Sequence, residues 1–107
     1  MKVKDIYLAV SSYTDVDQFK FLVCFNETIN EINLMYPVMD PLNNSTDLNC
    51  ESEYSDMYFA PIIDNILYLL GLGDRYKNEF LRKMKFVFCA WWKKKCSKTG
   101  FIKRSEY

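Results

Sequence analysis

Apolar residues recur every three or four positions in four stretches of the chain, which is the spacing of amphipathic helices. The first stretch, residues 2–10, predicts a short helix that Ser11 and Ser12 end. The second begins after a capping carboxylate, Asp15 or Asp17, and runs for about twenty residues until Pro37 stops it. Its expected buried stripe comprises Val16, Phe19, Leu22, Phe25, Ile29, Ile32 and Tyr36.

The third helix is expected to follow a cap at Ser55 or Asp56 and to end at Gly71 and Gly73, since glycine suits the dihedral angles of helix C-termini. Pro61 falls in its first turn, where a missing backbone N–H costs little. The wide apolar face of this helix comprises Phe59, Ile62, Ile63, Ile66, Leu67, Leu69 and Leu70.

The fourth helix is expected to follow a cap at Asp74 and to run from Arg75 to about Lys95. Its apolar stripe comprises Tyr76, Phe80, Met84, Val87 and Trp91. The rest of the surface of this helix is basic, which indicates that this side faces solvent or a partner.

Two further stretches lack helical periodicity. Residues 38–53 are rich in Asn, Asp, Ser and Pro, which predicts a loop or a poorly ordered excursion between the second and third helices. Residues 101–107 follow Thr99 and Gly100, alternate through Phe101, Lys103, Ser105 and Tyr107, and could add to a partner as an edge strand. We therefore predict an all-α fold: a three- to four-helix bundle over residues 1–96, with a long polar loop at 38–53 and an extended, partner-contacting C-terminal tail at 97–107.

The zero net charge of the chain hides a segregation of acid and base. Residues 1–74 hold three Lys against twelve Asp and Glu, a net charge of −9, whereas residues 75–107 hold eleven Lys and Arg against two Glu, a net charge of +9. Such a chain is suited to contact an oppositely charged partner, a nucleic acid or a copy of itself in head-to-tail order.

Composition limits the class of protein. A chain of 107 residues forms one domain with a thin core, and its aromatic content of 17% suggests that some rings face a partner. The first ten residues lack the apolar run of a secretory signal, and the longest apolar stretch, 57–72, is shorter than a membrane span of about 20 residues. The chain is therefore expected to be soluble, with Cys24 and Cys89 as buried thiols in a reducing compartment.

The residue types needed for catalysis are sparse. The chain has no His, which is the commonest general base, and its three Gly form no phosphate-binding loop. The acidic pairs, Asp15 with Asp17 and Glu51 with Glu53, lie two residues apart, which suits capping and solvation better than chelation. We therefore expect a protein that is not an enzyme, with no cofactor and no metal site.

Rings and cations alternate near the C-terminus, which is the composition of interface anchors and also of nucleic-acid contacts. The acidic first two-thirds of the chain would repel phosphate, so nucleic acid is expected only as a secondary partner. The residues expected to contact partner proteins or other copies are Trp91, Trp92, Lys93, Lys94, Lys95, Lys98, Phe101, Lys103, Arg104 and Tyr107.

Two stretches, residues 21–37 (FLVCFNETINEINLMYP) and 58–94, resemble the small head-tail connector, or adaptor, proteins of tailed bacteriophages. In that family a helix ends at a Tyr-Pro pair, and a later apolar helix leads through a Gly/Asp turn into a long helix with a Tyr-Lys signature. The positions that match are Asn26, Glu31, Ile32, Tyr36 and Pro37 in the first stretch, and Tyr68, Gly71, Asp74, Tyr76, Lys77 and Phe80 in the second.

The resemblance covers about half of the chain, and its motifs are structural. It implies a helical virion protein, assembled in the host cytoplasm, that forms a homo-oligomeric ring of about a dozen copies beneath the portal. The partners implied are the portal protein and downstream neck or tail proteins, with the C-terminal segment reaching for the portal. The double tryptophan and the lysine triplet have no counterpart in the family pattern.

Two other classes of function fit the same sequence. A small phage-encoded helical protein that binds and inhibits a host factor would form a stable complex with one bacterial protein. A nucleic-acid-binding module would use the basic C-terminus, and its affinity for DNA would fall steeply with salt.

Overall fold

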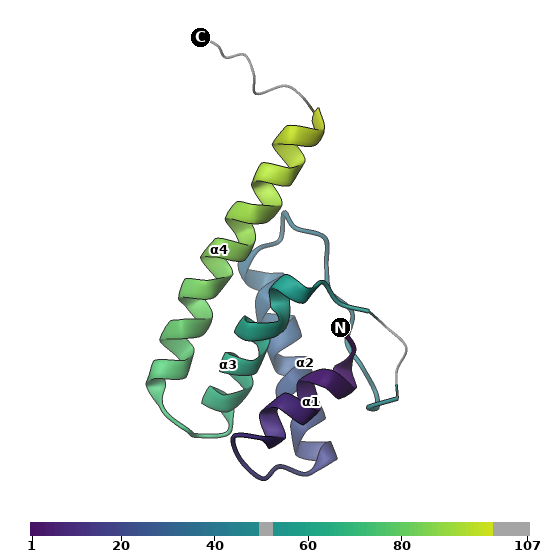
Figure 1. The fold of residues 1–107 in the computed structure, drawn as a ribbon, viewed down its shortest axis with the longest axis vertical. Coiled ribbons are helices and arrows are strands. Elements are labelled where there is room, and N and C mark those ends of the chain that lie inside the picture. The colour runs from purple at the N-terminus through teal and green to yellow at the C-terminus, as the bar shows by residue number, and fades with distance from the viewer. Residues whose placement is uncertain (50–52, 100–107) are drawn as a thin grey trace.

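The computed structural model describes the backbone of residues 1–49 and 53–99 and the side chains of these residues as far as Lys95. Within these ranges the chain is all-helical, which confirms the predicted fold class, and the element order follows the four predicted helices (Figure 1). The elements are α1 (Val3–Ser11), α2 (Gln18–Met35), a 3₁₀ turn η1 (Asp56–Tyr58), α3 (Phe59–Leu69) and α4 (Asp74–Thr99). None of the described helices is long and apolar enough to cross a membrane.

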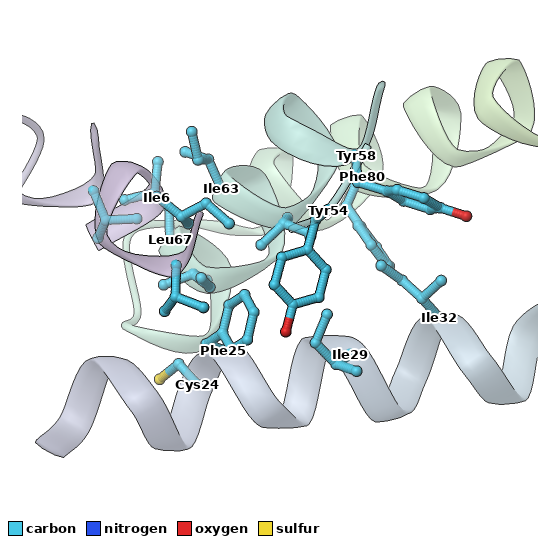
Figure 2. Close-up of a cluster of buried hydrophobic side chains, with 14 of the residues drawn as sticks. Ile6, Cys24, Phe25, Ile29, Ile32, Tyr54, Tyr58, Ile63, Leu67 and Phe80 are labelled. Atoms are coloured by element: carbon cyan, nitrogen blue, oxygen red, sulfur yellow. The ribbon is translucent and has the colours of Figure 1, made fainter. Parts of the chain in front are cut away.

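Helix α3 is the centre of the bundle. It contacts α4 on one side and α1 and α2 on the other (Figure 1). Every side chain from Pro61 to Leu67 is buried, so this short helix has no face in water over two turns. Figure 2 shows Phe25 and Ile29 of α2 directed away from that helix into the cluster, with Ile29 beside the ring of Tyr54. Burying an apolar side chain of this size contributes roughly 2 kcal/mol, so α3 organises the stability of the whole domain.

The turn between α3 and α4 depends on glycine. Gly71 and Gly73 both have positive φ, 89° and 136°, where any side chain would be strained.

Pro61 is the third residue of α3, in its first turn as predicted. Asp74 is the first residue of α4 rather than a residue before it, and its carboxylate lies near the positive end of the helix dipole.

The start of α3 differs from the prediction. The helix begins at Phe59, after the 3₁₀ turn, and neither Ser55 nor the N-cap residue Tyr58 makes a side-chain capping bond. At α2 the cap is Asp17, whose carboxylate accepts a hydrogen bond of 2.8 Å from the backbone N–H of Lys20. The N-cap predicted from the sequence is therefore correct at α2 and wrong at α3. The first turn of α3 is stabilised by the packing of its apolar face instead.

The buried stripe of α2 also differs from the prediction at its N-terminal end. Phe19 is 78% exposed, whereas Phe21 is fully buried against Tyr7 of α1, with ring centroids 5.1 Å apart. The reason is helical rotation: six residues before Phe25 the side chain points about 120° away from the core. The α2 residues that are buried are Phe21, Cys24, Phe25, Thr28, Ile29 and Ile32.

The polar loop after α2 lies against that helix. Asn26 exchanges two hydrogen bonds with the backbone of Ser45, of 2.8 and 2.9 Å, and Asn33 does the same with Leu42, at 3.0 and 2.9 Å. Met39 and Ser45 are buried. The described part of the loop is therefore an ordered segment, and the polar face of α2 is the surface that holds it.

Helix α4 is longer than predicted. It continues past Lys95 and through the expected domain boundary at residue 96 to Thr99. Figure 1 shows its C-terminal end extending beyond the other helices. Residues 97–99, which were predicted to be part of an extended tail, are helical. The tail contacts expected from Phe101, Lys103, Arg104 and Tyr107 lie outside the described residues.

Candidate functional site

The first half of α4 is fixed to the bundle by a polar network inside the core. Asn65 of α3 is fully buried, and its side-chain amide donates to Thr28 Oγ1 at 3.0 Å and to Glu31 Oε1 at 3.3 Å. Lys77 Nζ of α4 donates to Asn65 Oδ1 at 3.2 Å and to Glu31 Oε2. The network joins α2, α3 and α4 in one place, so it determines how α4 is oriented on the bundle.

A second set of ion pairs continues along the same half of α4. Lys83 Nζ lies 2.7 Å from the carboxylate of Asp64, which is buried, and Arg82 pairs with Glu79. The hydrogen bond from Arg82 lowers the pKa of Glu79, since it stabilises the ionised carboxylate. Three cations of this half, on Lys77, Arg82 and Lys83, are thus neutralised within the protein.

The cations of the second half of α4 are different. Lys93, Lys94 and Lys95 are exposed, and none forms a salt bridge with another described residue. In the first half, Arg75 and Lys85 are also exposed and form no salt bridge with a described residue. The largest contiguous group of available cations therefore lies on the part of α4 that extends beyond the other helices (Figure 1).

Four aromatic rings accompany this charge. Phe88 stacks on Tyr36 at 5.3 Å between centroids and on Trp91 at 5.8 Å, and Trp92 lies 6.4 Å from Phe88. Burial raises the pKa of Tyr36, which is the last residue before Pro37 and ties the end of α2 to α4. Trp92 remains 54% exposed at the outer end of the cluster, whereas Trp91 is half-buried.

The structure places five of the predicted contact residues together. Trp91, Trp92 and Lys93 to Lys95 share the last described turns of α4, and Lys95 Nζ lies 5.6 Å from the centre of the Trp91 ring. Lys98 lies on the same helix, but its side chain is not described.

Sequence reasoning missed a hollow beside these residues. A space of about 350 Å³ opens between α4 and the segment that precedes α3. Lys94, Lys95 and Trp91 line it from α4, and its opposite wall includes Asp40 and Met57. A loop residue 54 positions away cannot be assigned to α4 by local periodicity, so no sequence signal marked Asp40 as a neighbour of Lys94.

Nucleophilic and metal-binding groups do not converge in the described part of the chain. No three His, Cys, Asp or Glu side chains there come close enough to hold a metal ion. Cys24 is a free thiol whose pKa is raised by burial. Cys89 is also free but exposed, so the expectation that both cysteines are buried is correct only for Cys24. The arrangement suits non-covalent recognition, through rings and ammonium groups on one helix.

Comparison with protein-family models, with curated proteins and with solved structures finds no match for this chain. The resemblance to phage connector proteins therefore depends on the sequence motifs. Within the fold, two of those motif residues from different stretches, Glu31 and Lys77, form an ion pair. Lys77 Nζ also lies 5.5 Å from the ring centre of Tyr68 and 5.0 Å from that of Phe80, two further motif positions. These four residues share one structural cluster.

Proposed function

We propose that this protein is a structural, non-catalytic component of a tailed-phage neck, and that it binds its neighbours through the C-terminal half of α4. The observation that carries the proposal is the division of charge along this helix. Three cations of its first half, on Lys77, Arg82 and Lys83, are paired internally, whereas the contiguous Lys93, Lys94 and Lys95 are exposed and form no salt bridge among the described residues, next to the exposed Trp92. Unpaired cations beside an exposed tryptophan are typical of interface anchors.

The phage context comes from the connector resemblance. The clustering of Glu31, Tyr68, Lys77 and Phe80 supports it, because residues that determine how three helices pack are the ones that related folds would share. In this proposal the protein forms a ring beneath the portal of the virion, and α4 reaches toward an acidic surface of the portal or of an adjacent neck protein. A helix anchored by partly buried ion pairs presents its end at a fixed angle, which suits docking in a symmetric assembly.

The proposal is tested by charge reversal at the lysine triplet. The variant Lys93→Glu/Lys94→Glu/Lys95→Glu should lose co-sedimentation with the portal ring of the same phage while its circular dichroism stays helical, since all three side chains are exposed. The control variant Lys4→Glu/Lys20→Glu reverses exposed lysines elsewhere and should bind as the wild type does. Unchanged binding of the triple variant would refute the assignment.

A second candidate function, binding of single-stranded nucleic acid, is favoured by the exposed Trp92 ring next to the three lysines. Stacking of a base on an exposed ring contributes about 1–3 kcal/mol, and the lysines would neutralise phosphates. This function predicts that an oligonucleotide quenches tryptophan fluorescence, and that the affinity falls steeply as salt rises. An absence of quenching at low salt would eliminate it.

A further inference from the structure

One flank of α4 carries a groove that neither the core nor the aromatic cluster occupies. The hollow beside Lys94 shares Met57 and Ala90 with a second hollow of about 340 Å³, so the two form one continuous depression. We call it the α4 groove; its lining includes Asp40, Met57, Phe86, Ala90, Lys94 and Lys95.

The α4 groove is apolar over most of its length and has a net positive charge at one end. Phe86 is 64% exposed and Met57 is 36% exposed, although both are large apolar side chains. Lys94 and Lys95 line one end opposite Asp40, whereas Lys83 at the other end is already paired with Asp64. The distance along the helix from residue 83 to residue 94 is roughly 16 Å, which is the length of a three-turn helix.

A matching surface lies on the outer face of α2. Phe19 is 78% exposed and Val23 is 44% exposed, and they lie one helical turn apart on the side opposite the core. Asp15 and Asp17 precede them, and Glu27 follows one turn later; all three are exposed. We call these five residues the outer α2 stripe. Its carboxylates form no ion pair with any described residue.

The two surfaces are complementary in order and in charge. Along α4 the groove changes from the apolar Phe86 and Ala90 to the bases Lys94 and Lys95. Along α2 the stripe changes from the apolar Phe19 and Val23 to the acid Glu27. Both step by four residues, since Phe86, Ala90 and Lys94 match the spacing of Phe19, Val23 and Glu27. An amphipathic helix that lays its apolar residues into a groove is a common mode of recognition.

We propose that the outer α2 stripe of one copy docks into the α4 groove of the next copy. The inference rests on the proposed function in one respect, that the protein assembles with itself, and it names the two surfaces that do so. They lie on different helices with α3 between them, so one copy can use both at once. Such a heterologous contact repeats from copy to copy and closes into a ring when the rotation allows it.

Two single substitutions test the contact. Phe19→Asp should disable the stripe and Phe86→Asp the groove, and both sites are exposed enough for the fold to tolerate the change. Sedimentation velocity at concentrations up to roughly 1 mM should show self-association of the wild type, and each variant alone should associate at least about tenfold more weakly. An equimolar mixture of the two variants should form a 1:1 dimer and nothing larger, because only one intact stripe and one intact groove remain to meet.

Leu8→Asp is the matched control on α1, where an apolar side chain is 57% exposed outside both surfaces. It should self-associate as the wild type does, and portal binding is measured separately on the wild type, so failure of this inference and failure of the proposed function give different results. A wild type that stays monomeric over the whole concentration range overturns the inference, and leaves the groove to a different protein. Equal association of Phe19→Asp and the wild type, or a mixture that stays monomeric, also overturns it.

Discussion

The buried network around Asn65 should contribute strongly to the stability of the bundle. Asn65→Leu keeps a side chain of similar size but removes the donor to Thr28 and Glu31 and the acceptor for Lys77. Hydrogen bonds to charged groups are worth about 1.5–3 kcal/mol each, and the Lys77–Glu31 pair survives the change. Partial exposure of Glu31 and Lys77 reduces the loss, so we expect the free energy of unfolding to fall by about 2–4 kcal/mol.

The assay is urea unfolding followed by circular dichroism at 222 nm, which gives the midpoint and the slope m of the transition for the wild type and the variant. If the two slopes are equal, the shift in midpoint gives the change in the free energy of unfolding. The matched control is Asn78→Leu, the same substitution at an exposed position of α4, which should change stability by less than about 0.5 kcal/mol. If Asn65→Leu is as stable as the wild type, the network does not stabilise the attachment of α4. The reasoning would then be refuted, because apolar burial would have replaced the polar bonds without loss.

Three further predictions follow from individual side chains. Gly71→Ala should lower stability by about 1 kcal/mol in the same urea assay, because φ at this position is 89°, and an unchanged midpoint would show that the turn relaxes. In a variant that lacks Cys50 and Cys96, a thiol reagent should modify exposed Cys89 rapidly and buried Cys24 only on unfolding, since burial raises the pKa of the Cys24 thiol. Equal rates of modification would contradict the packing of α2. The hydrogen bond from Arg82 lowers the pKa of Glu79 in the folded state, so this pair stabilises the fold at pH values above the unfolded pKa of Glu, near 4.3. The stabilisation disappears as the pH falls through the lower folded pKa. Glu79→Gln should therefore flatten the plot of stability against pH in this range, and a plot identical to that of the wild type would refute the pairing.

The sequence predicted the helices well because their apolar periodicity is local. The stripe of Phe80, Met84 and Val87 on α4 is buried as expected. Phe19 was misplaced because repeated steps of three residues drift off the buried face of a helix. Six residues before Phe25, Phe19 lies about 120° from it, whereas Phe21, four residues before Phe25, lies on the same face and contacts Tyr7 of α1.

The candidate site was predicted only in part, for a related reason. The rings and lysines at residues 91–95 are contiguous in sequence, so their grouping on one helix could be foreseen. Pairing between distant residues could not. Asn65 meets Lys77 and Glu31 across 12 and 34 positions, and Asp64 meets Lys83 across 19. These contacts distinguish the cations of α4 that are paired within the protein from those that are available to a partner. The charges counted along the sequence do not distinguish the two groups.

The central claim is that the exposed cations and Trp92 at the end of α4 join this protein to a portal. The most direct test is native mass spectrometry of the purified portal ring of the same phage, incubated with the wild type or with the Lys93/Lys94/Lys95 triple glutamate variant. The wild type should add several copies to the ring, and the variant should add none. A portal ring whose mass stays unchanged with the wild type, or one that gains the variant equally, would contradict the claim.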